Sequence, residues 1–472
     1  MPIFSTPVSI EIERLERFSG VEDAGFLARA YACSRRSLSA VLLSGGDLRD
    51  SGENRYSIAA WKPLAAMTAR NGLCRVETGA AGVSEFRADP LDVLDRIFET
   101  MTPAFDLEVT PFSGGAVGYL AYDLKHAIER LPAFAVDDLG LPDIFLFWPG
   151  QILVHDREAK ELSILDLKFA GTGGPPSGPW VPPAGSDRPP GAFRTGQPRS
   201  NFTHEAYLAA VGKIRSYIRN GDVYQVNLSQ RFQFELDGNP YLLWRTLFDI
   251  NPAPFYAFIH AGDHQVLSTS MERFLLRRGP MIETRPIKGT RGRGKTKEED
   301  ADLVSDLLQS PKDDAELSMI VDLLRNDLGR ICLPGTIRVV EHKRVETYQN
   351  VHHLVSIVAG ELPPGTPHGQ IIRATFPGGS ITGCPKIRSM EIIDELEPNV
   401  RHAYTGAIGY LGWHANLDLN VAIRTAIVKD GICYFSVGGG IVYDSVEEEE
   451  YRETLDKGRT LFDLTRKPGG AK

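Results

Sequence analysis

The amino-acid sequence predicts an α+β protein whose core is a large mixed or antiparallel β-sheet flanked by helices. Strand-like and helix-like segments do not alternate strictly along the chain, which disfavours a doubly wound parallel sheet. The chain has 472 residues, enough to bury a large core, and its 42% hydrophobic and 24% charged residues are typical of a globular protein.

The N-terminal region, residues 1–168, is predicted to be rich in strands, because β-branched and aromatic residues there lie between turn signals. The predicted strands cover residues 39–46, 55–61, 114–124 and 161–167, with two more in 143–156 on either side of a Pro-Gly turn. In residues 89–101 the apolar side chains recur at helical spacing, which predicts a helix.

Residues 169–200 are predicted to form a linker. Half of the residues in 171–200 are proline or glycine. Proline lacks a backbone N–H and glycine weakens helices and strands, so this composition predicts an extended, exposed segment. It divides the N-terminal region from a C-terminal domain, residues 201–466.

The C-terminal domain mixes helices and strands. A helix is predicted from Thr203 to near Asn220-Gly221. Another opens at Ser310-Pro311, where the serine caps the helix and Asp313 lies near its positive end, and this helix carries Glu316. Predicted strands cover residues 223–236, 407–412, 418–428 and 431–443, and a last helix starts near residue 447.

Charge and cysteine usage exclude several classes of protein. The net charge is −9 and no basic stripe is present, so a nucleic-acid binder is disfavoured. The five cysteines are scattered, which argues against a disulfide framework or a structural zinc site. No signal peptide and no apolar run long enough to span a bilayer are visible, so no membrane association and a cytoplasmic location are expected.

One loop allows two interpretations. Residues 289–296 spell G-x-x-x-x-G-K-T, the pattern of a phosphate-binding loop with Lys295 as its lysine. Such a loop must follow a buried strand, and Thr284 to Lys288, with a proline and two cations, make a poor one. A nucleotide site therefore remains a lesser alternative.

Lys288, just before that loop, supports the other interpretation. A lysine amine is a nucleophile only when neutral, and burial or a neighbouring cation lowers its pKa toward that state. Arg285 and Arg291 flank Lys288 in the sequence, so we expect them to contribute. An ordinary solvated lysine is the competing interpretation.

The segment "RPIKGTRGRG" around Lys288 resembles the signature loop of the chorismate-utilising enzymes. The resemblance extends from about residue 200 to 462, and "VLLSGG" and "GGAVGYLAYDL" in the N-terminal region are more weakly similar to the family. Further segments resemble this family in the family's order: residues 221–232, 270–274, 315–330, 351–356, 376–386, 403–410, 422–427, 438–445 and 450–457.

Two positions indicate the branch of the family. Lysine at 288 is similar to the aminodeoxychorismate synthases, whereas anthranilate synthases usually have alanine there. Members that add water to chorismate place a lysine base where this chain has Gln225, which cannot be that base. One departure is Met271, where the family usually has a proline before the glutamate; the loss of proline makes the approach of Glu272 less rigid.

The resemblance implies a role for each matching residue. Lys288 would attack ring carbon 2 of chorismate and Glu272 would act as general acid or base at the departing 4-hydroxyl. Glu316 and Glu453 would hold Mg²⁺, with Glu450 one helical turn before Glu453 shaping that site. The positions that would bind the substrate are Gln225, His353, Ser380, Tyr404, Arg424, Gly438, Gly440 and Lys457.

The implied reaction is amination of chorismate at ring carbon 4, toward 4-aminobenzoate and folate. The ammonia would come from a separate glutaminase subunit, because Cys384 in "TGCPK" does not form a G-x-C-x-G nucleophile elbow. Anthranilate synthesis from chorismate is the closest alternative. A nucleotide-binding protein using Lys295 and a non-catalytic binding subunit are rivals from other classes.

Overall fold

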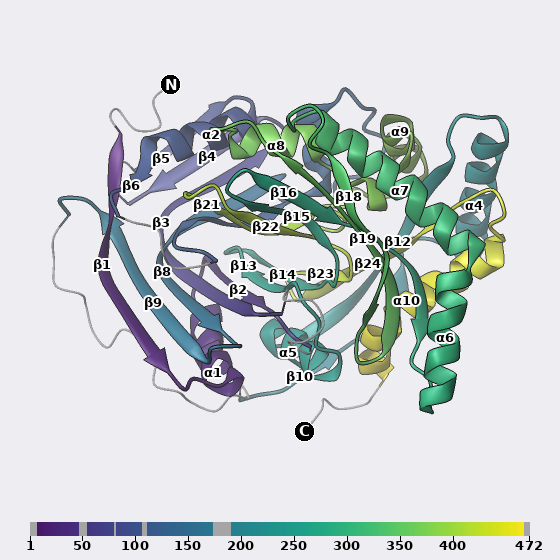
Figure 1. Ribbon diagram of the computed structural model, residues 1–472, viewed down its shortest axis with the longest axis horizontal. Coiled ribbons are helices and arrows are strands. Elements are labelled where there is room, and N and C mark those ends of the chain that lie inside the picture. Colours follow the sequence, from purple (N-terminus) through teal and green to yellow (C-terminus); the bar gives the residue numbers. More distant parts are fainter. Residues whose placement is uncertain (1–6, 47–53, 80–81, 106–110, 173–189, 467–472) are drawn as a thin grey trace.

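The computed structural model describes residues 7–46, 54–79, 82–105, 111–172 and 190–466 (Figure 1). Within these residues the strand pairings are antiparallel, apart from β1 with β6 and one isolated bridge. Helices pack around this sheet, which confirms the predicted α+β class. None of the described helices is both long and apolar enough to cross a bilayer.

The N-terminal region is built mainly of strands, as predicted. Its strands are β1 (Val8–Ser19), β2 (Ser39–Leu43), β3 (Tyr56–Arg70), β4 (Leu73–Thr78), β5 (Gly82–Arg87), β6 (Met101–Pro103), β7 (Gly115–Leu120), β8 (Ile144–Asp156) and β9 (Glu161–Phe169). Its helices are α1 (Asp23–Ser34), α2 (Pro90–Thr100), α3 (Lys125–Ile128) and the 3-10 turn η1 (Tyr122–Leu124).

The prediction of two strands in residues 143–156 was wrong, because β8 runs through the Pro-Gly pair without a turn. Pro149 lies opposite Pro63 of β3, where the register between the two strands shifts. A proline fits a strand at such an irregularity because no ladder hydrogen bond is required of it. A side chain at Gly150 would approach the Lys62 carbonyl to 2.8 Å, so glycine permits the close contact.

The strands of the C-terminal domain are β12 (Gln225–Gly238), β13 (Tyr256–His260), β14 (His264–Thr269), β15 (Arg273–Arg278), β16 (Met281–Arg285), β17 (Ile287–Gly292), β18 (Arg338–Thr347), β19 (Val351–Glu361), β20 (Gly383–Cys384), β21 (Ala407–Gly412), β22 (Leu417–Val421), β23 (Thr425–Lys429) and β24 (Ile432–Ile441). Its helices are α4 (His204–Arg219), α5 (Pro240–Ile250), α6 (Lys297–Gln309), α7 (Pro311–Gly329), α8 (His368–Thr375), the 3-10 turn η2 (Gly379–Ile381), α9 (Lys386–Leu396) and α10 (Glu447–Arg466).

Strands from both sides of the predicted linker belong to one sheet. β2 pairs with β13, and β7 pairs with β21. Within the linker, residues 173–189 lie outside the described part, while β10 (Phe193–Thr195) and β11 (Arg199–Ser200) are short strands paired with β12. The last part of residues 169–200 is therefore not a free segment, because the exposed edge of β12 supplies hydrogen bonds to it.

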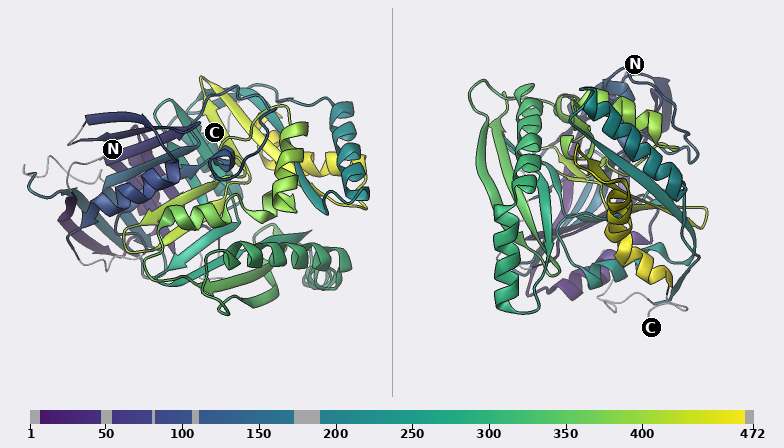
Figure 2. Two further views of the ribbon diagram at one scale, coloured as in Figure 1. Left: turned by 90° about the horizontal axis from the view of Figure 1, so that it is seen from above. Right: turned by 90° about the vertical axis from the view of Figure 1, so that its right-hand side faces the viewer.

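Two runs of strands diverge from the β3–β8 pair. One continues through β2, β13, β14, β23, β24 and β12. The other continues through β7, β21, β22, β15, β16 and β19, which also pairs with β17 and β18. Strands β1, β3, β8 and β9 lie at one end of the molecule, and α4, α6, α7 and α10 at the other (Figures 1 and 2).

Candidate active site

A cavity of about 890 Å³ lies between the two runs of strands and is also lined by residues of α7 and α10. Its walls come from β17 and β19 on one side and from β12 and β24 on the other. Most of the predicted site residues line it: Lys288, Glu272, Glu316, His353, Ser380, Tyr404, Arg424, Gly438, Gly440, Glu453 and Lys457. The fold thus brings together residues that are up to 185 positions apart in the sequence, since the first of them is Glu272 and the last Lys457.

Gln225 is the predicted site residue that the structure keeps out of the cavity. Its side chain is buried against β24, where a Cβ on Gly440 would lie 2.4 Å from its amide nitrogen. The Gln225 side-chain amide oxygen is buried and has no hydrogen-bond partner among the described residues. Gln225 therefore packs against the strand that lines the cavity without lining the cavity itself.

Lys288 extends from β17 into the cavity. Burial lowers the pKa of its amine, and the Lys457 ammonium acts in the same direction, while Glu272 and Glu316 oppose the shift. A lowered pKa makes the neutral, nucleophilic amine more accessible. The surroundings of this lysine therefore suit a reactive amine.

The expected contribution of the two flanking arginines was wrong. Arg285 pairs with Glu283 at 2.8 Å, and Arg291 pairs with Asp306 at 2.6 Å and with Asp313 at 3.1 Å. Both cations are thus engaged by carboxylates, so Lys288 owes its lowered pKa to burial rather than to its sequence neighbours.

Glu272 lies in the connection between β14 and β15, close enough to Lys288 for the two groups to act on each other's pKa. Its side chain is buried, and burial raises the pKa of the carboxyl above its ordinary value. The Ser380 hydroxyl donates to Glu272 Oε1 at 2.7 Å and, together with Lys288, partly offsets that shift. A carboxyl that keeps its proton nearer to neutral pH is suited to general acid catalysis.

Glu316 on α7 and Glu453 on α10 reach the cavity from two separate helices, together with Glu450. A Cβ on Gly439 would lie 3.3 Å from carboxylate oxygens of both Glu450 and Glu453, which places these two side by side. Burial raises the pKa of Glu316 and of Glu450. For Glu453 the adjacent Lys457 ammonium, 2.6 Å away, outweighs burial and holds the pKa low.

These carboxylates have the donor chemistry that Mg²⁺ prefers, since hard oxygens from one or two side chains commonly hold it together with substrate oxygens and water. No group of three or more His, Cys, Asp or Glu side chains in the described residues forms a ready-made metal cluster. The arrangement fits an ion held by Glu316 and Glu453 and completed by an oxygen-bearing ligand, rather than a closed structural site.

Arg424 provides an unpaired cation in the cavity wall. It lies between β22 and β23, where the single strand predicted for residues 418–428 is interrupted and Arg424 adopts a positive φ of 51°. That left-handed conformation, rare outside glycine, sends the chain and this side chain out of the strand. Across the described residues, no side chain accepts a hydrogen bond from its guanidinium, and burial lowers its pKa.

Tyr404 and His353 lie near Arg424. Arg424 acts electrostatically on both, and burial with this cation lowers the pKa of His353 to about 4, so the imidazole is neutral at physiological pH. His353 Nδ1 is 2.9 Å from the Thr290 hydroxyl, while Nε2 is buried and no described residue forms a hydrogen bond with it. The guanidinium, a phenol and an unsatisfied ring nitrogen together suit an anionic, oxygen-rich ligand.

The backbone of β24 supplies a second anion-binding element. Gly438 lies opposite Ser229 of β12, and Gly440 opposite Asn227. The Ser229 and Asn227 N–H groups bond to acceptors outside β24, at 2.7 and 2.8 Å. Both pairs are therefore the non-hydrogen-bonded kind, in which the N–H groups of both residues point away from the partner strand.

The outer edge of β24 is open where these glycines lie. β23 pairs with β24 only from residue 432 to Phe435. The Gly438 carbonyl, on the same edge as its N–H, accepts from Lys457 Nζ at 3.0 Å. The Gly438 and Gly440 N–H groups are thus directed toward the cavity, as two donors suited to a carboxylate.

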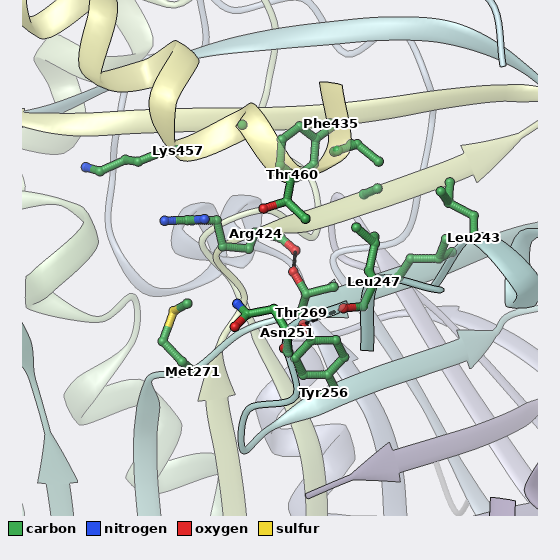
Figure 3. Close-up of a pocket in the computed structure, with 14 residues that line it drawn as sticks. Leu243, Leu247, Asn251, Tyr256, Thr269, Met271, Arg424, Phe435, Lys457 and Thr460 are labelled. Carbon is green, nitrogen blue, oxygen red and sulfur yellow. Dashed lines mark hydrogen bonds between the residues drawn. The ribbon is translucent and has the colours of Figure 1, made fainter. Parts of the chain in front are cut away.

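A small side chamber of about 40 Å³ adjoins the cavity behind Arg424. It shares Asn251, Met271, Arg424, Lys457 and Thr460 with the cavity. Figure 3 shows the nitrogen ends of Arg424 and Lys457 directed away from its apolar Leu side chains. Met271, which replaces the family's usual proline, therefore borders both spaces.

Some residues that line the cavity were not predicted from the sequence, notably Asn227, Thr290 and Lys312. Thr290 was within the loop that the sequence singled out, but the register of β17 shifts between Lys288 and Thr290, so strand alternation alone does not place it. Asn227 and Lys312 carry no local signal, because only the crossing of distant elements brings them to the cavity.

The G-x-x-x-x-G-K-T pattern does not form a vacant phosphate site. The N–H of Gly294 donates to Asp300 at 2.8 Å and that of Lys295 to Glu299 at 2.7 Å. Arg293 also pairs with Asp300, at 2.9 Å. Carboxylates of the chain itself occupy the donors that a phosphate would need, so the geometry argues against a nucleotide site here.

Known proteins resemble this chain over most of its length. Residues 47–463 match the family described as chorismate binding enzyme. The chain is 39% identical over 416 residues to aminodeoxychorismate synthase component 1 of Bacillus subtilis (strain 168), covering 85% of this chain and 87% of that protein. It is 37% identical over 438 residues to anthranilate synthase component 1 of Cereibacter sphaeroides, covering 89% and 87%.

A solved structure is similar as well. The crystal structure of anthranilate synthase component I from Streptococcus pneumoniae TIGR4 has a TM-score of 0.76 and 32% sequence identity, covering 86% of this chain and 92% of that one. The family match spans nearly the whole sheet and every residue that lines the cavity. This chain therefore belongs to the family of chorismate binding enzymes.

Proposed function

We propose that this protein aminates chorismate at ring carbon 4, yielding 4-amino-4-deoxychorismate on the way to 4-aminobenzoate and folate. The relatives named aminodeoxychorismate synthase component 1 support this activity. Sequence identity alone does not separate them from anthranilate synthase, because 39% and 37% are nearly equal. The observation that carries the proposal is Lys288, an amine in the cavity wall whose pKa burial lowers and whose charge is coupled to that of Glu272.

Chorismate carries two carboxylates, and the cavity offers a matching set of donors. The Arg424 guanidinium with Tyr404 would bind the enolpyruvyl carboxylate, since an arginine fork suits a carboxylate. The Gly438 and Gly440 N–H groups would bind a carboxylate as well, and His353 and Lys457, which also line the cavity, would donate to the remaining oxygens. These contacts would hold the ring between Lys288 and Glu272.

The first step would form a bond from Lys288 Nζ to ring carbon 2. The two conjugated double bonds shift, and the bond from carbon 4 to its hydroxyl breaks. Glu272 donates a proton to the departing oxygen, which leaves as water, and the amine loses its own proton to solvent. Dividing one displacement of a poor leaving group into two steps is the advantage of covalent catalysis.

The second step would reverse the shift. Neutral ammonia attacks carbon 4, the double bonds return, and the bond from carbon 2 to Lys288 breaks. The released lysine takes back a proton, and the product loses one from its new amine. Because lysine adds and leaves at the same carbon, the net change is replacement of the 4-hydroxyl by an amine.

The ammonia is proposed to come from a separate glutaminase subunit. The name component 1 in the relatives implies a partner component for those proteins. In this chain, burial raises the pKa of the Cys384 thiol, which disfavours the thiolate that a glutaminase nucleophile requires. Cys384 also lies in β20 beside a proline, outside a nucleophile elbow.

Glu316 and Glu453 are proposed to hold Mg²⁺, which when bound would neutralise the ring carboxylate and the negative charge that develops around it. We expect Glu316→Gln to raise the Mg²⁺ concentration for half-maximal activity by about tenfold or more, because one of two charged ligands is lost. Activity titrated against Mg²⁺ checks this, with Glu298→Gln on the exposed start of α6 as control. An unchanged Mg²⁺ requirement would remove Glu316 from the metal site.

Ser380→Ala is expected to change the pH dependence of turnover. The Ser380 hydroxyl stabilises the charged form of Glu272, so its removal raises the Glu272 pKa further. Because the acid acts when protonated, the alkaline limb of kcat/KM against pH should move to higher pH. Lys288 and Lys457, the charged groups that lower the Glu272 pKa, are unchanged in this variant. A limb that stays in place or moves to lower pH contradicts the assignment of Glu272 as the acid.

Product analysis tests the proposed function directly. Purified protein is incubated with chorismate, Mg²⁺ and an ammonium salt, and products are separated by chromatography with and without an added aminodeoxychorismate lyase. We expect 4-aminobenzoate only when the lyase is present. Anthranilate synthesis is the second candidate, favoured by the anthranilate synthase relatives, and fluorescent anthranilate formed without lyase would establish it instead.

A further inference from the structure

A buried ion pair outside the cavity, Glu397 with Arg401, connects two parts of the active site. Arg401 donates to Glu397 through Nε at 2.8 Å and through Nη2 at 2.6 Å. Both side chains are almost fully buried, with exposed fractions of 2% and 4%, and neither lines the cavity. Burying two charges is costly unless further hydrogen bonds satisfy them, so their other partners indicate what the pair is for.

The pair completes the edge of β12 beyond the short strand β20. Glu397 Oε1 accepts from the Ser229 N–H at 2.7 Å and from the Ser229 hydroxyl at 2.9 Å. Arg401 Nη2 donates to the Asn227 carbonyl at 2.7 Å. An ion pair thus takes the place of a neighbouring strand at these two residues, where β20 no longer pairs with β12.

This arrangement fixes which way the glycines of β24 face. Ser229 and Asn227 are the residues opposite Gly438 and Gly440. The ion pair holds the Ser229 N–H and the Asn227 carbonyl on the far edge, and the Thr382 carbonyl holds the Asn227 N–H, so these groups do not bond to the glycines. A shift of one residue in register would reverse this and turn the Gly438 and Gly440 N–H groups into the sheet.

The same arginine holds the turn that carries Ser380. Arg401 Nη1 donates to the Ile381 carbonyl at 3.0 Å, and the Asn227 side-chain amide donates to the same oxygen at 3.1 Å. Ser380, the residue before Ile381, donates to Glu272. The position of the hydrogen bond that tunes Glu272 therefore depends on Arg401.

We propose that Glu397 and Arg401 are positioning residues that hold the carboxylate-binding N–H groups of β24 and the Ser380–Glu272 hydrogen bond in one fixed relation. Neither touches the substrate. Through Ser229 and Asn227 they set the direction of the glycine donors, and through Ile381 they set Ser380. This inference rests on the proposed function, because it assigns those two elements to chorismate binding and to proton donation.

Two variants test the inference, with a matched control. Arg401→Lys keeps a buried cation but loses the fork that reaches the Asn227 and Ile381 oxygens. Ser229→Ala removes only the hydroxyl bond to Glu397 and provides a milder change that preserves folding. As control, Asp327→Asn weakens another buried ion pair, with Lys386 at 2.7 Å, whose members do not line the cavity.

Chorismate dissociation constants are measured by calorimetry in a Lys288→Ala background, where no turnover interferes. We expect Arg401→Lys to weaken binding about 10- to 100-fold, and Ser229→Ala about two- to tenfold. Asp327→Asn should leave the dissociation constant within about twofold even where it lowers the melting temperature. A substitution that does not touch the ligand or its binding residues is expected to change the affinity little. With Lys288 present, Arg401→Lys should also move the alkaline limb of kcat/KM to higher pH.

A purely structural role predicts a different pattern. The melting temperature of Arg401→Lys would then fall while chorismate affinity and the pH profile match those of Asp327→Asn, and the inference would be overturned. Absence of chorismate turnover in the wild type would instead refute the proposed function. The affinity ratios between variants still decide whether the ion pair positions the anion-binding glycines.

Discussion

Lys288→Ala is expected to abolish formation of 4-amino-4-deoxychorismate. Without the amine no bond forms at ring carbon 2, and ammonia would have to displace the 4-hydroxyl in a single difficult step. We expect kcat to fall by about 1,000-fold or more, as when other covalent nucleophiles are removed, with chorismate still bound because its carboxylate-binding residues remain. Stopped assays with lyase coupling measure the rate, and calorimetry measures binding.

Lys295→Ala is the matched control, since Lys295 belongs to the same segment and is exposed at the start of α6. It should keep wild-type activity, because its backbone N–H is already engaged by Glu299 and its side chain does not line the cavity. If Lys295→Ala lost activity while Lys288→Ala kept it, the assignment of the reactive lysine would be reversed. Equal activity of both variants would remove a lysine nucleophile from the reaction.

Glu272→Gln is expected to produce the second large loss. Glutamine is isosteric and can still accept from Ser380, but it cannot give a proton to the departing hydroxyl. We expect kcat to fall by about 100- to 10,000-fold, the usual contribution of a general acid, while the chorismate dissociation constant changes little. The alkaline limb attributed to Glu272 should disappear from the remaining activity.

Glu283→Gln is a suitable comparison, because Glu283 is a nearby glutamate that pairs with Arg285 and does not line the cavity. It should retain most of the activity. A Glu272→Gln enzyme that turns over at the wild-type rate with an unchanged pH profile would show that another group, or water, protonates the leaving oxygen.

Features set by neighbouring residues were predictable from the sequence. The helix start at Ser310 is confirmed, with its hydroxyl accepting from the Asp313 N–H at 3.2 Å, and Thr203 caps α4 in the same way. Capping depends on residues three positions apart, so it is visible locally. In contrast, β10 and β11 were missed because their hydrogen bonds come from β12, which lies further along the chain.

In the candidate site too, features set by neighbouring residues were predictable and features set by distant residues were not. The segments that resemble the family around Lys288, Glu272 and Glu316 contain residues that line the cavity. The expected influence of Arg291 failed because its guanidinium is paired with Asp306 and Asp313, which the sequence around Lys288 does not reveal. Gln225 packs against Gly440 and is absent from the cavity wall, although its neighbour on the same face of β12, Asn227, lines it. The Glu397–Arg401 pair has no sequence signal beyond an i, i+4 spacing, because its role comes from distant backbone groups.

Intact-protein and peptide mass spectrometry of the protein mixed with chorismate and Mg²⁺, without ammonia, tests the covalent step most directly. We expect a mass increase equal to chorismate less one water, located on the peptide that contains Lys288 and absent from Lys288→Ala. Addition of ammonium salt should discharge it to product at the rate of turnover. Product formation at the full rate with Lys288 unmodified at every time point would contradict the account.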